Sequence, residues 1–147
     1  MQFWLMKSEP DEVSIDDLAA RPGQTIPWFG VRNYQARNFL RDAMQIGDQA
    51  FFYHSGCAMP GIAGICEVCS MPYPDETQFV TPQGDFLRGA VNPYFDPKSS
   101  LDKPRWWLRD VRLVRKTLFV SLAELRTRTE LANMRLLARG NRLSITP

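Results

Sequence analysis

Short apolar runs alternate with clusters of turn-forming residues along the chain, a pattern typical of a protein built mostly from strands. Phe3 to Lys7 mixes aromatic and aliphatic residues and is followed by Ser-Glu-Pro, so it predicts a buried strand. The other predicted strands are Gln49 to His54, Gly61 to Val68, Trp106 to Val114 and Arg142 to Thr146.

Helices are predicted where capping residues precede apolar positions spaced three and four apart. Ser14 and Ser121 each stand three residues before an acidic residue, the form of a capping box, and each opens a short helix. The strongest helical pattern begins after Asn33 and ends at Gly47. Its apolar positions are Ala36, Phe39, Leu40, Ala43 and Met44. A further short helix is predicted at 131–137.

The chain is predicted to fold as one domain. Its 147 residues suffice for one core, and neither an internal repeat nor a linker divides 1–147. Strands separated by short helices indicate a mixed α/β fold that is mostly β. Met71 to Pro104 holds six prolines and predicts a long irregular excursion over the surface.

Composition narrows the class of protein. Apolar residues make up 44% and charged residues 23%, which is ordinary globular usage and argues against disordered and fibrous classes. No apolar run approaches the ~20 residues that span a bilayer, and the first residues lack the pattern of a secretion signal. We therefore expect a cytoplasmic monomer that does not associate with a membrane.

The three cysteines are interpreted as free thiols, because their number is odd and no secretion signal is seen. Together with His54, residues Cys57, Cys66 and Cys69 have a spacing that superficially resembles a zinc knuckle. Cys66 and Cys69 lie in or just after an apolar strand, where small thiols usually pack. No metal site is expected.

Charge is distributed unevenly. Residues 1–100 carry 7 Lys/Arg against 12 Asp/Glu, a balance of −5, whereas 101–147 carry 11 against 4, a balance of +7. This last third includes arginines 105, 109, 112, 115, 126, 128, 135, 139 and 142. They suit phosphate contacts of a nucleic-acid binder, or alternatively the solvated faces of strands and helices.

The densest candidate site lies at Trp28 to Asn38, where an indole, a phenol, amides and guanidinium groups precede a helix. Such groups stack on a planar base and bond to its edge. The alternative is that Asn33 only caps the helix and the aromatic residues only fill the core. Lys7 and Glu9 sit where the first strand ends, and His54 with Ser55 ends another, positions where sites are often built. The alternatives are a surface ion pair and a structural histidine.

The chain resembles the EVE-domain family nearly end to end. The resemblance rests on Trp4 to Pro10, Gly30 to Arg41, Phe51 to Ser55, Pro60 to Gly64, Tyr73 to Asp75, Asp96-Pro97, Trp106, Asp110-Val111 and Arg142 to Ser144. The block Gly-Val-Arg-Asn-Tyr-Gln-Ala-Arg-Asn is its most specific part.

This resemblance implies a PUA-like pseudobarrel of about five to seven strands flanked by short helices. It also implies a binding module that recognises a modified nucleobase in DNA or RNA, without a cofactor. The implied ligand-binding residues are Lys7, Glu9, Trp28, Arg32, Asn33, Tyr34, His54, Ser55, Trp106 and Ser144.

The sequence departs from the family pattern at three places. Phe29 stands where the family usually has Asp, so a carboxylate that could bond the ligand is lost or moved. The chain stops at Pro147, where relatives generally continue into a C-terminal helix, and Pro82 to Val91 lengthens a loop.

Three functions remain open at this point. In a binding module, a base stacks on Trp28 or Trp106 and is read by Asn33 and Arg32.

In an amidohydrolase of modified nucleosides, by analogy with the related ASCH domains, Lys7 and Glu9 would serve a nucleophile. The candidate nucleophiles are Ser8, Thr25 and Ser55. A structural subunit has only the long proline-rich loop in its favour. The distance between Lys7 and a hydroxyl discriminates the binding module from the amidohydrolase. A hydrogen bond of about 2.6 to 3.2 Å is expected in the enzyme, and a longer distance favours binding alone.

Overall fold

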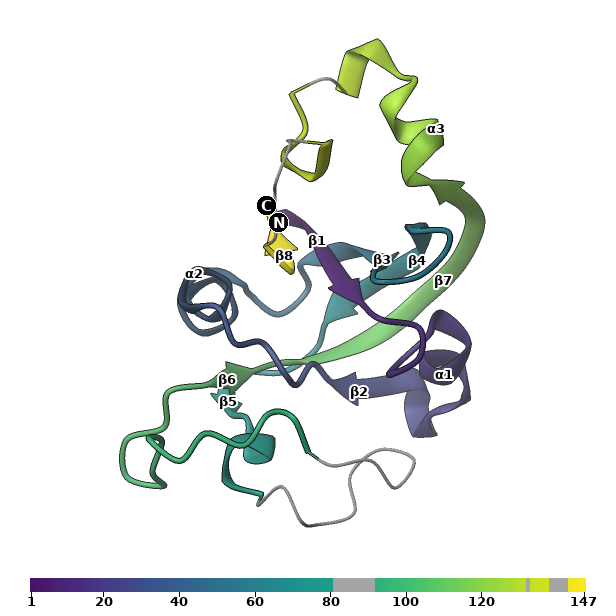
Figure 1. The fold of residues 1–147 in the computed structure, drawn as a ribbon. Coiled ribbons are helices and arrows are strands. Elements are labelled where there is room, and N and C mark those ends of the chain that lie inside the picture. The colour runs from purple at the N-terminus through teal and green to yellow at the C-terminus, as the bar shows by residue number, and fades with distance from the viewer. Residues whose placement is uncertain (81–91, 132, 138–142) are drawn as a thin grey trace.

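The computed structural model describes residues 1–80, 92–131, 133–137 and 143–147. Its large sheet contains β1 (Phe3–Ser8), β2 (Thr25–Pro27), β3 (Gln49–His54), β4 (Gly61–Val68), β7 (Asp110–Ser121) and β8 (Ile145–Thr146). The spatial order is β2-β7-β4-β3-β1-β8, and the sheet is strongly curved (Figure 1). A separate two-stranded ribbon pairs β5 (Tyr73–Pro74) with β6 (Trp107–Leu108). The predicted mixed fold, mostly of strands, is confirmed.

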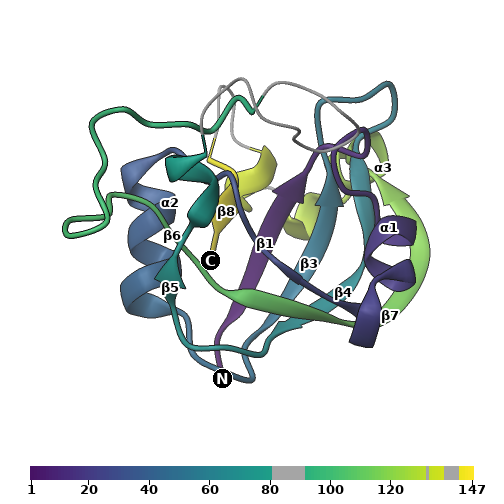
Figure 2. The same ribbon diagram turned by 90° about the horizontal axis from the view of Figure 1, so that it is seen from below.

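Short helices flank this sheet. They are α1 (Ile15–Ala20), α2 (Tyr34–Asn38) and α3 (Leu122–Arg126), with 3-10 turns at Pro22–Gln24, Glu76–Phe79, Thr129–Leu131 and Arg135–Leu137. In both ribbon views α2 lies to one side of β1 and α1 to the other (Figures 1 and 2), and residues of both helices pack in the same hydrophobic cluster. In the described ranges, none of the helices has the length and apolar character that crossing a membrane requires.

Strand pairing brings distant segments together at one edge of the fold. β1 runs parallel to β3, with Lys7 opposite Tyr53 and Ser8 opposite His54, whereas the other strand pairs are antiparallel. The pairing continues past the strand ends, because the Ser55 amide donates to the Ser8 carbonyl at 2.9 Å. The carboxyl ends of β1 and β3 therefore lie side by side.

Alternating side chains of β1 supply two hydrophobic clusters on the two faces of the sheet. Trp4 and Met6 pack in the larger cluster with Phe52 and residues of α1 and α2. Leu5 faces the smaller cluster, which includes Leu125 of α3. Phe3, predicted to be part of a buried strand, is 65% exposed.

The two predicted helix starts with serine caps are confirmed. Ser14 and Asp17 form a reciprocal capping box at α1, and the Ser121 hydroxyl accepts from the Glu124 amide at α3. Asn33 caps α2, because its Oδ1 accepts from the Ala36 amide at 3.1 Å. Each cap satisfies an amide that has no partner within its helix.

The helix after Asn33 differs from the predicted one in its second half, where Phe39–Ala43 forms a wide π turn. Buried Arg109 explains the widening, because its Nε donates to the Leu40 carbonyl at 2.5 Å. The Met44 amide then donates to the Phe39 carbonyl, five residues back. Met44 stays buried, whereas Ala43, predicted on the same face, is exposed.

β7 is longer than the predicted strand, which ended at Val114. It continues to Ser121 because β4 pairs with it along its whole length, as far as Gly61 opposite Ser121. The predicted excursion at 71–104 contains β5 and one 3-10 turn among its described residues. The inserted stretch at 82–91 lies outside the described residues.

Candidate functional site

A cavity of about 460 Å³ opens beside the ends of β1 and β3, within the size range of small-ligand sites. It is lined by Lys7, Ser8, Glu9, Glu12, Val13, Ile26, Pro27, Trp28, Phe29, Gly30, Val31, Ser55, Gly56, Tyr94 and Ser144. Strand pairing positions the polar end of this lining, because the Lys7 amide donates to the Ser144 carbonyl at 2.8 Å. Segments from five parts of the sequence therefore meet around one space.

Half of the ten site residues predicted from the sequence line this cavity. They are Lys7, Glu9, Trp28, Ser55 and Ser144. The other five lie outside its lining and have structural contacts described below. They are Arg32, Asn33, Tyr34, His54 and Trp106.

Among the described residues that line the cavity, Lys7 is the one with a cationic side chain. Burial lowers the pKa of its ammonium group, which makes no hydrogen bond or ion pair with the described residues. Ser8, Ser55 and Ser144 line the same space, yet the Ser8 hydroxyl donates instead to the Val13 carbonyl at 2.6 Å. The Lys7–hydroxyl hydrogen bond required by the amidohydrolase hypothesis is thus not formed among the described residues.

Two carboxylates, those of Glu9 and Glu12, line the same cavity. The Tyr94 hydroxyl donates to the Glu12 carboxylate at 2.6 Å, and burial together with this bond raises the pKa of Tyr94. Glu9 lies against Gly56, where an added Cβ would stand 2.8 Å from Glu9 Oε1. Gly56 also has φ +62°, so this corner of the lining requires glycine.

The walls between these polar groups are aromatic. Trp28 is 5% exposed and packs edge-on against Phe52, with ring centroids 5.4 Å apart, so it belongs to both the core and the cavity lining. Phe29 packs edge-on against Tyr94 at 5.8 Å. The position where the family pattern has a carboxylate is therefore an apolar wall in this chain.

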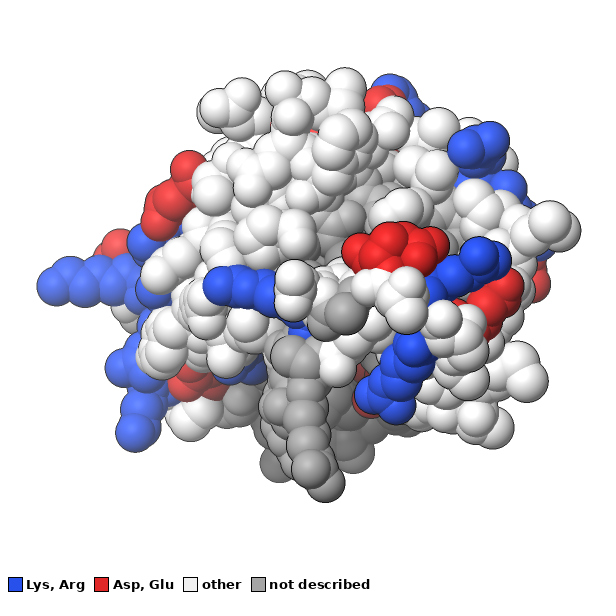
Figure 3. Space-filling model, turned by 90° about the horizontal axis from the view of Figure 1, so that it is seen from above, with Lys and Arg blue, Asp and Glu red and all other residues white. Residues whose placement is uncertain are grey.

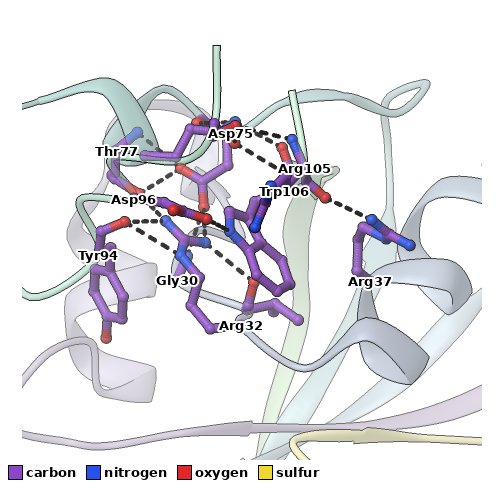
Figure 4. Close-up of polar contacts among 12 residues, drawn as sticks. Gly30, Arg32, Arg37, Asp75, Thr77, Tyr94, Asp96, Arg105 and Trp106 are labelled. Carbon is purple, nitrogen blue, oxygen red and sulfur yellow. Dashed lines mark hydrogen bonds and ion pairs between the residues drawn. The ribbon is translucent and has the colours of Figure 1, made fainter. Parts of the chain in front are cut away.

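Arg32 bonds protein groups at the cavity rim, which is formed by Gly30, Val31 and Tyr94 (Figure 4). Its Nε and Nη2 donate to the Tyr94 carbonyl, at 3.2 and 2.8 Å. The remaining N–H groups donate to the Val31 carbonyl, Asp75 Oδ2 and Thr77 Oγ1. A guanidinium has five N–H groups, and all five are used here. That Arg32 reads a base edge stays a prediction, and in this structure its N–H groups bond protein atoms.

Asp75 fixes the position of Arg32 and Gly30 by accepting their hydrogen bonds. Its Oδ2 accepts from the Gly30 amide at 2.8 Å and from Arg32 at 3.1 Å, and its Oδ1 accepts from the amide and hydroxyl of Thr77. Gly30 has φ +85°, and an added Cβ would stand 2.7 Å from the Tyr94 ring. The buried carboxylate therefore holds Gly30 and Arg32, and Arg32 in turn bonds the Tyr94 carbonyl.

Trp106 already has two ring partners within the protein. Tyr34 stacks on it at 4.9 Å, and the Arg32 guanidinium lies 5.3 Å from its ring centroid. Its Nε1 donates to Asp96 at 2.7 Å. The hypothesis that Trp106 stacks a ligand is therefore not supported, whereas Trp28 borders the cavity.

His54 and Asn33 have the structural roles that the alternative interpretation gave them. His54 Nε2 accepts from the Ile15 amide at 3.1 Å, and burial lowers the pKa of its imidazole, which favours the neutral form. Asn33 is exposed and caps α2.

The cysteines do not form a cluster with His54. Cys66 is fully buried, and its thiol donates to the Ala50 carbonyl at 3.7 Å, whereas Cys57 is exposed. Across the described ranges, no three His, Cys, Asp or Glu side chains lie close enough to hold a metal ion.

Among the described residues, several basic side chains of the last third are engaged by other protein groups. Arg109, a candidate phosphate contact, is 4% exposed and bonds the Leu40 and Ser70 carbonyls. Arg112 pairs with Glu67 and Lys116 with Asp16. In the face drawn in Figure 3, basic and acidic side chains are interspersed.

Sequence reasoning missed Glu12, Tyr94 and Asp75 as parts of the site. Asp75 and Tyr94 stand in short segments with proline, Tyr73-Pro74-Asp75 and Asn92-Pro93-Tyr94, which is the one signal that marked them. Glu12 has no local signal, because its role depends on contact with a residue 82 positions away.

Comparison with known proteins identifies the family of this chain. Residues 2–147 match the family described as EVE domain. Human thymocyte nuclear protein 1 is 48% identical over 162 residues, covering 98% of this chain and 67% of that protein. The chicken (Gallus gallus) protein of that name is 46% identical, covering 98% and 62%, and the mouse (Mus musculus) protein is covered over 55% of its length. The chain thus spans between about half and two thirds of these curated relatives.

Solved structures of other proteins also resemble this chain in fold and sequence. A crystal structure of human THYN1 protein in complex with 5-methylcytosine containing DNA has a TM-score of 0.86 at 45% identity, covering 100% of this chain and 90% of that one. A crystal structure of a protein from Pseudomonas putida has a TM-score of 0.84 at 46% identity, covering 99% and 90%. Together with the end-to-end sequence match, these likenesses show that the chain belongs to the EVE-domain family.

Proposed function

We propose that this protein is a binding module that takes a modified nucleobase of DNA into the cavity beside β1 and β3, with 5-methylcytosine as the first candidate. The observation that carries the proposal is the lining itself. An ammonium group without a hydrogen-bond partner among the described residues, two carboxylates and aromatic rings line one cavity. The human relative in complex with 5-methylcytosine containing DNA supports the choice of ligand.

Cytosine chemistry fits these groups. Its exocyclic amine donates and suits a carboxylate such as Glu9 or Glu12, and its ring nitrogen and carbonyl accept and suit Lys7. A methyl group at C5 requires an apolar wall, which Trp28 and Phe29 provide. A base within a duplex reaches such a cavity only after it has rotated out of the stack.

The test is fluorescence anisotropy with a duplex that carries one 5-methylcytosine, against the same duplex with cytosine. Lys7→Met keeps most of the apolar stem and removes the donor, and a hydrogen bond to a charged group contributes about 1.5 to 3 kcal/mol. The affinity for the modified duplex should fall about 10- to 100-fold. Lys116→Met, on β7 and outside the cavity lining, is the matched control. Equal affinity of Lys7→Met and Lys116→Met would overturn the proposal.

Hydrolysis of an amide on a modified nucleoside is the second candidate, favoured by the lowered pKa of Lys7 beside three serines. It requires a Lys7–hydroxyl hydrogen bond that the described residues do not make. Incubation of the protein with a nucleoside bearing an amide on its base, followed by chromatography, separates the two functions. Turnover abolished by Lys7→Met would favour the enzyme.

A further inference from the structure

A continuous stack of rings and guanidinium groups leads from the cavity wall to the surface. The Arg32 guanidinium lies 5.3 Å from the ring centroids of both Tyr94 and Trp106. Tyr34 stacks on Trp106 at 4.9 Å, and the Arg37 guanidinium lies 4.8 Å from the Tyr34 ring. Because each contact is a favourable aromatic or cation–π pair, the stack holds Arg37 at a fixed position relative to the cavity.

The arginines around this stack differ in how many of their N–H groups already donate a hydrogen bond within the protein. Arg32 uses all five N–H groups inside the protein, as described above. Arg37 donates to Asn38 Oδ1 twice and to the Arg105 carbonyl, which leaves two N–H groups unused among the described residues. The Arg105 side chain makes no hydrogen bond or ion pair within the described ranges, and Arg41 leaves its Nη1 group unused.

These arginines also lie close to one another. Arg37 and Arg41 are four residues apart and face the same side, and the Arg105 backbone is bonded to Arg37 (Figure 4). Burial, and then the charge of Arg41, lower the pKa of Arg37, as expected for cations held near each other. Asp42 pairs with Arg41, and Asp96 accepts from the Trp106 indole and the Lys98 amide while the charge of Arg105 also acts on it. The three arginines thus outnumber these two carboxylates.

We propose that Arg37, Arg41 and Arg105 form a phosphate-binding surface for the DNA strand whose base enters the cavity. Unused guanidinium N–H groups match phosphate oxygens, and three arginines against two carboxylates, Asp42 and Asp96, leave a net positive charge that attracts a polyanion. Such contacts position the strand, whereas the cavity reads the base. The proposal rests on the DNA binding proposed above, and its test is chosen to separate the two.

The experiment measures anisotropy of modified and unmodified duplexes over a series of salt concentrations, with the double variant Arg37→Gln/Arg105→Gln. Removal of one arginine–phosphate interaction should lower the log–log salt slope by about 0.9, so the double variant should lose almost two. The ratio of affinities for modified and unmodified duplex should stay unchanged. Arg128→Gln, an exposed arginine beyond α3, is the control and should keep the wild-type slope.

Arg105→Gln alone guards against unfolding, because its side chain makes no hydrogen bond or ion pair with the described residues, and it should lower the slope by about 0.9. An unchanged slope in both variants, with wild-type binding to DNA intact, overturns the phosphate surface and leaves the cavity proposal standing. A lost preference for the modified base at an unchanged slope also overturns it, because these arginines would then shape the cavity. Failure of the wild type to bind either duplex overturns both proposals.

Discussion

Replacement of Asp75 by asparagine tests whether the buried ion pair with Arg32 holds the cavity rim. Asp75 is almost fully buried and accepts two hydrogen bonds at each oxygen, from Gly30 and Arg32 at one and from Thr77 at the other. An amide keeps the shape of the side chain, but either orientation turns an NH₂ group toward two donors. Two hydrogen bonds are lost, and the Arg32 charge loses its partner.

The expected cost is about 3 kcal/mol of unfolding free energy. Removal of one partner of a buried ion pair costs about 3 to 5 kcal/mol. The lower end applies because the Arg32 side chain is 22% exposed and keeps its bonds to backbone carbonyls. Since a domain is stable by only about 5 to 15 kcal/mol, this loss is a large share of the total.

Urea unfolding followed by tryptophan fluorescence measures the change. At an m-value of about 2 kcal/mol/M, the midpoint should fall by about 1.5 M without a change in m. The control is Asp42→Asn, which breaks the surface pair with Arg41 and should leave the midpoint unchanged. Binding of a modified nucleoside should weaken in Asp75→Asn alone. If the two variants unfold at the same urea concentration, the anchoring role is refuted.

Gly30→Ala should lower the melting temperature and ligand affinity, because a Cβ at φ +85° meets the Tyr94 ring and costs more than about 1 kcal/mol. Thiol labelling of the native protein, read by mass spectrometry, should modify exposed Cys57 and spare Cys66, whose pKa burial raises to about 12. Reaction of Cys66 before unfolding would contradict this. Burial lowers the pKa of His54, so its contribution to stability is present above its ordinary value of 6.5 and is lost as the pH falls. The urea midpoint should therefore drop more in wild type than in His54→Gln between about pH 7 and pH 5.

The sequence alone determined the features that depend on neighbouring residues. The capping boxes at Ser14 and Ser121 and the cap at Asn33 require only groups three residues apart, and all three formed. The strands at Gln49–His54 and Gly61–Val68 were predicted with the observed bounds, because their apolar runs end at turn-forming residues. The family resemblance likewise depends on short local blocks and was confirmed.

Contacts between distant segments decided the rest. β7 extends beyond its apolar pattern because β4 offers a partner for its backbone, and the π turn forms because Arg109 takes the Leu40 carbonyl. Arg32 and Trp106, whose side-chain types suggested that they read a base, make contacts with protein groups in the structure: Arg32 bonds Asp75, and Trp106 stacks on Tyr34. A side chain's type indicates which bonds it can make, but only the folded chain determines whether a protein group or a ligand is there to make them.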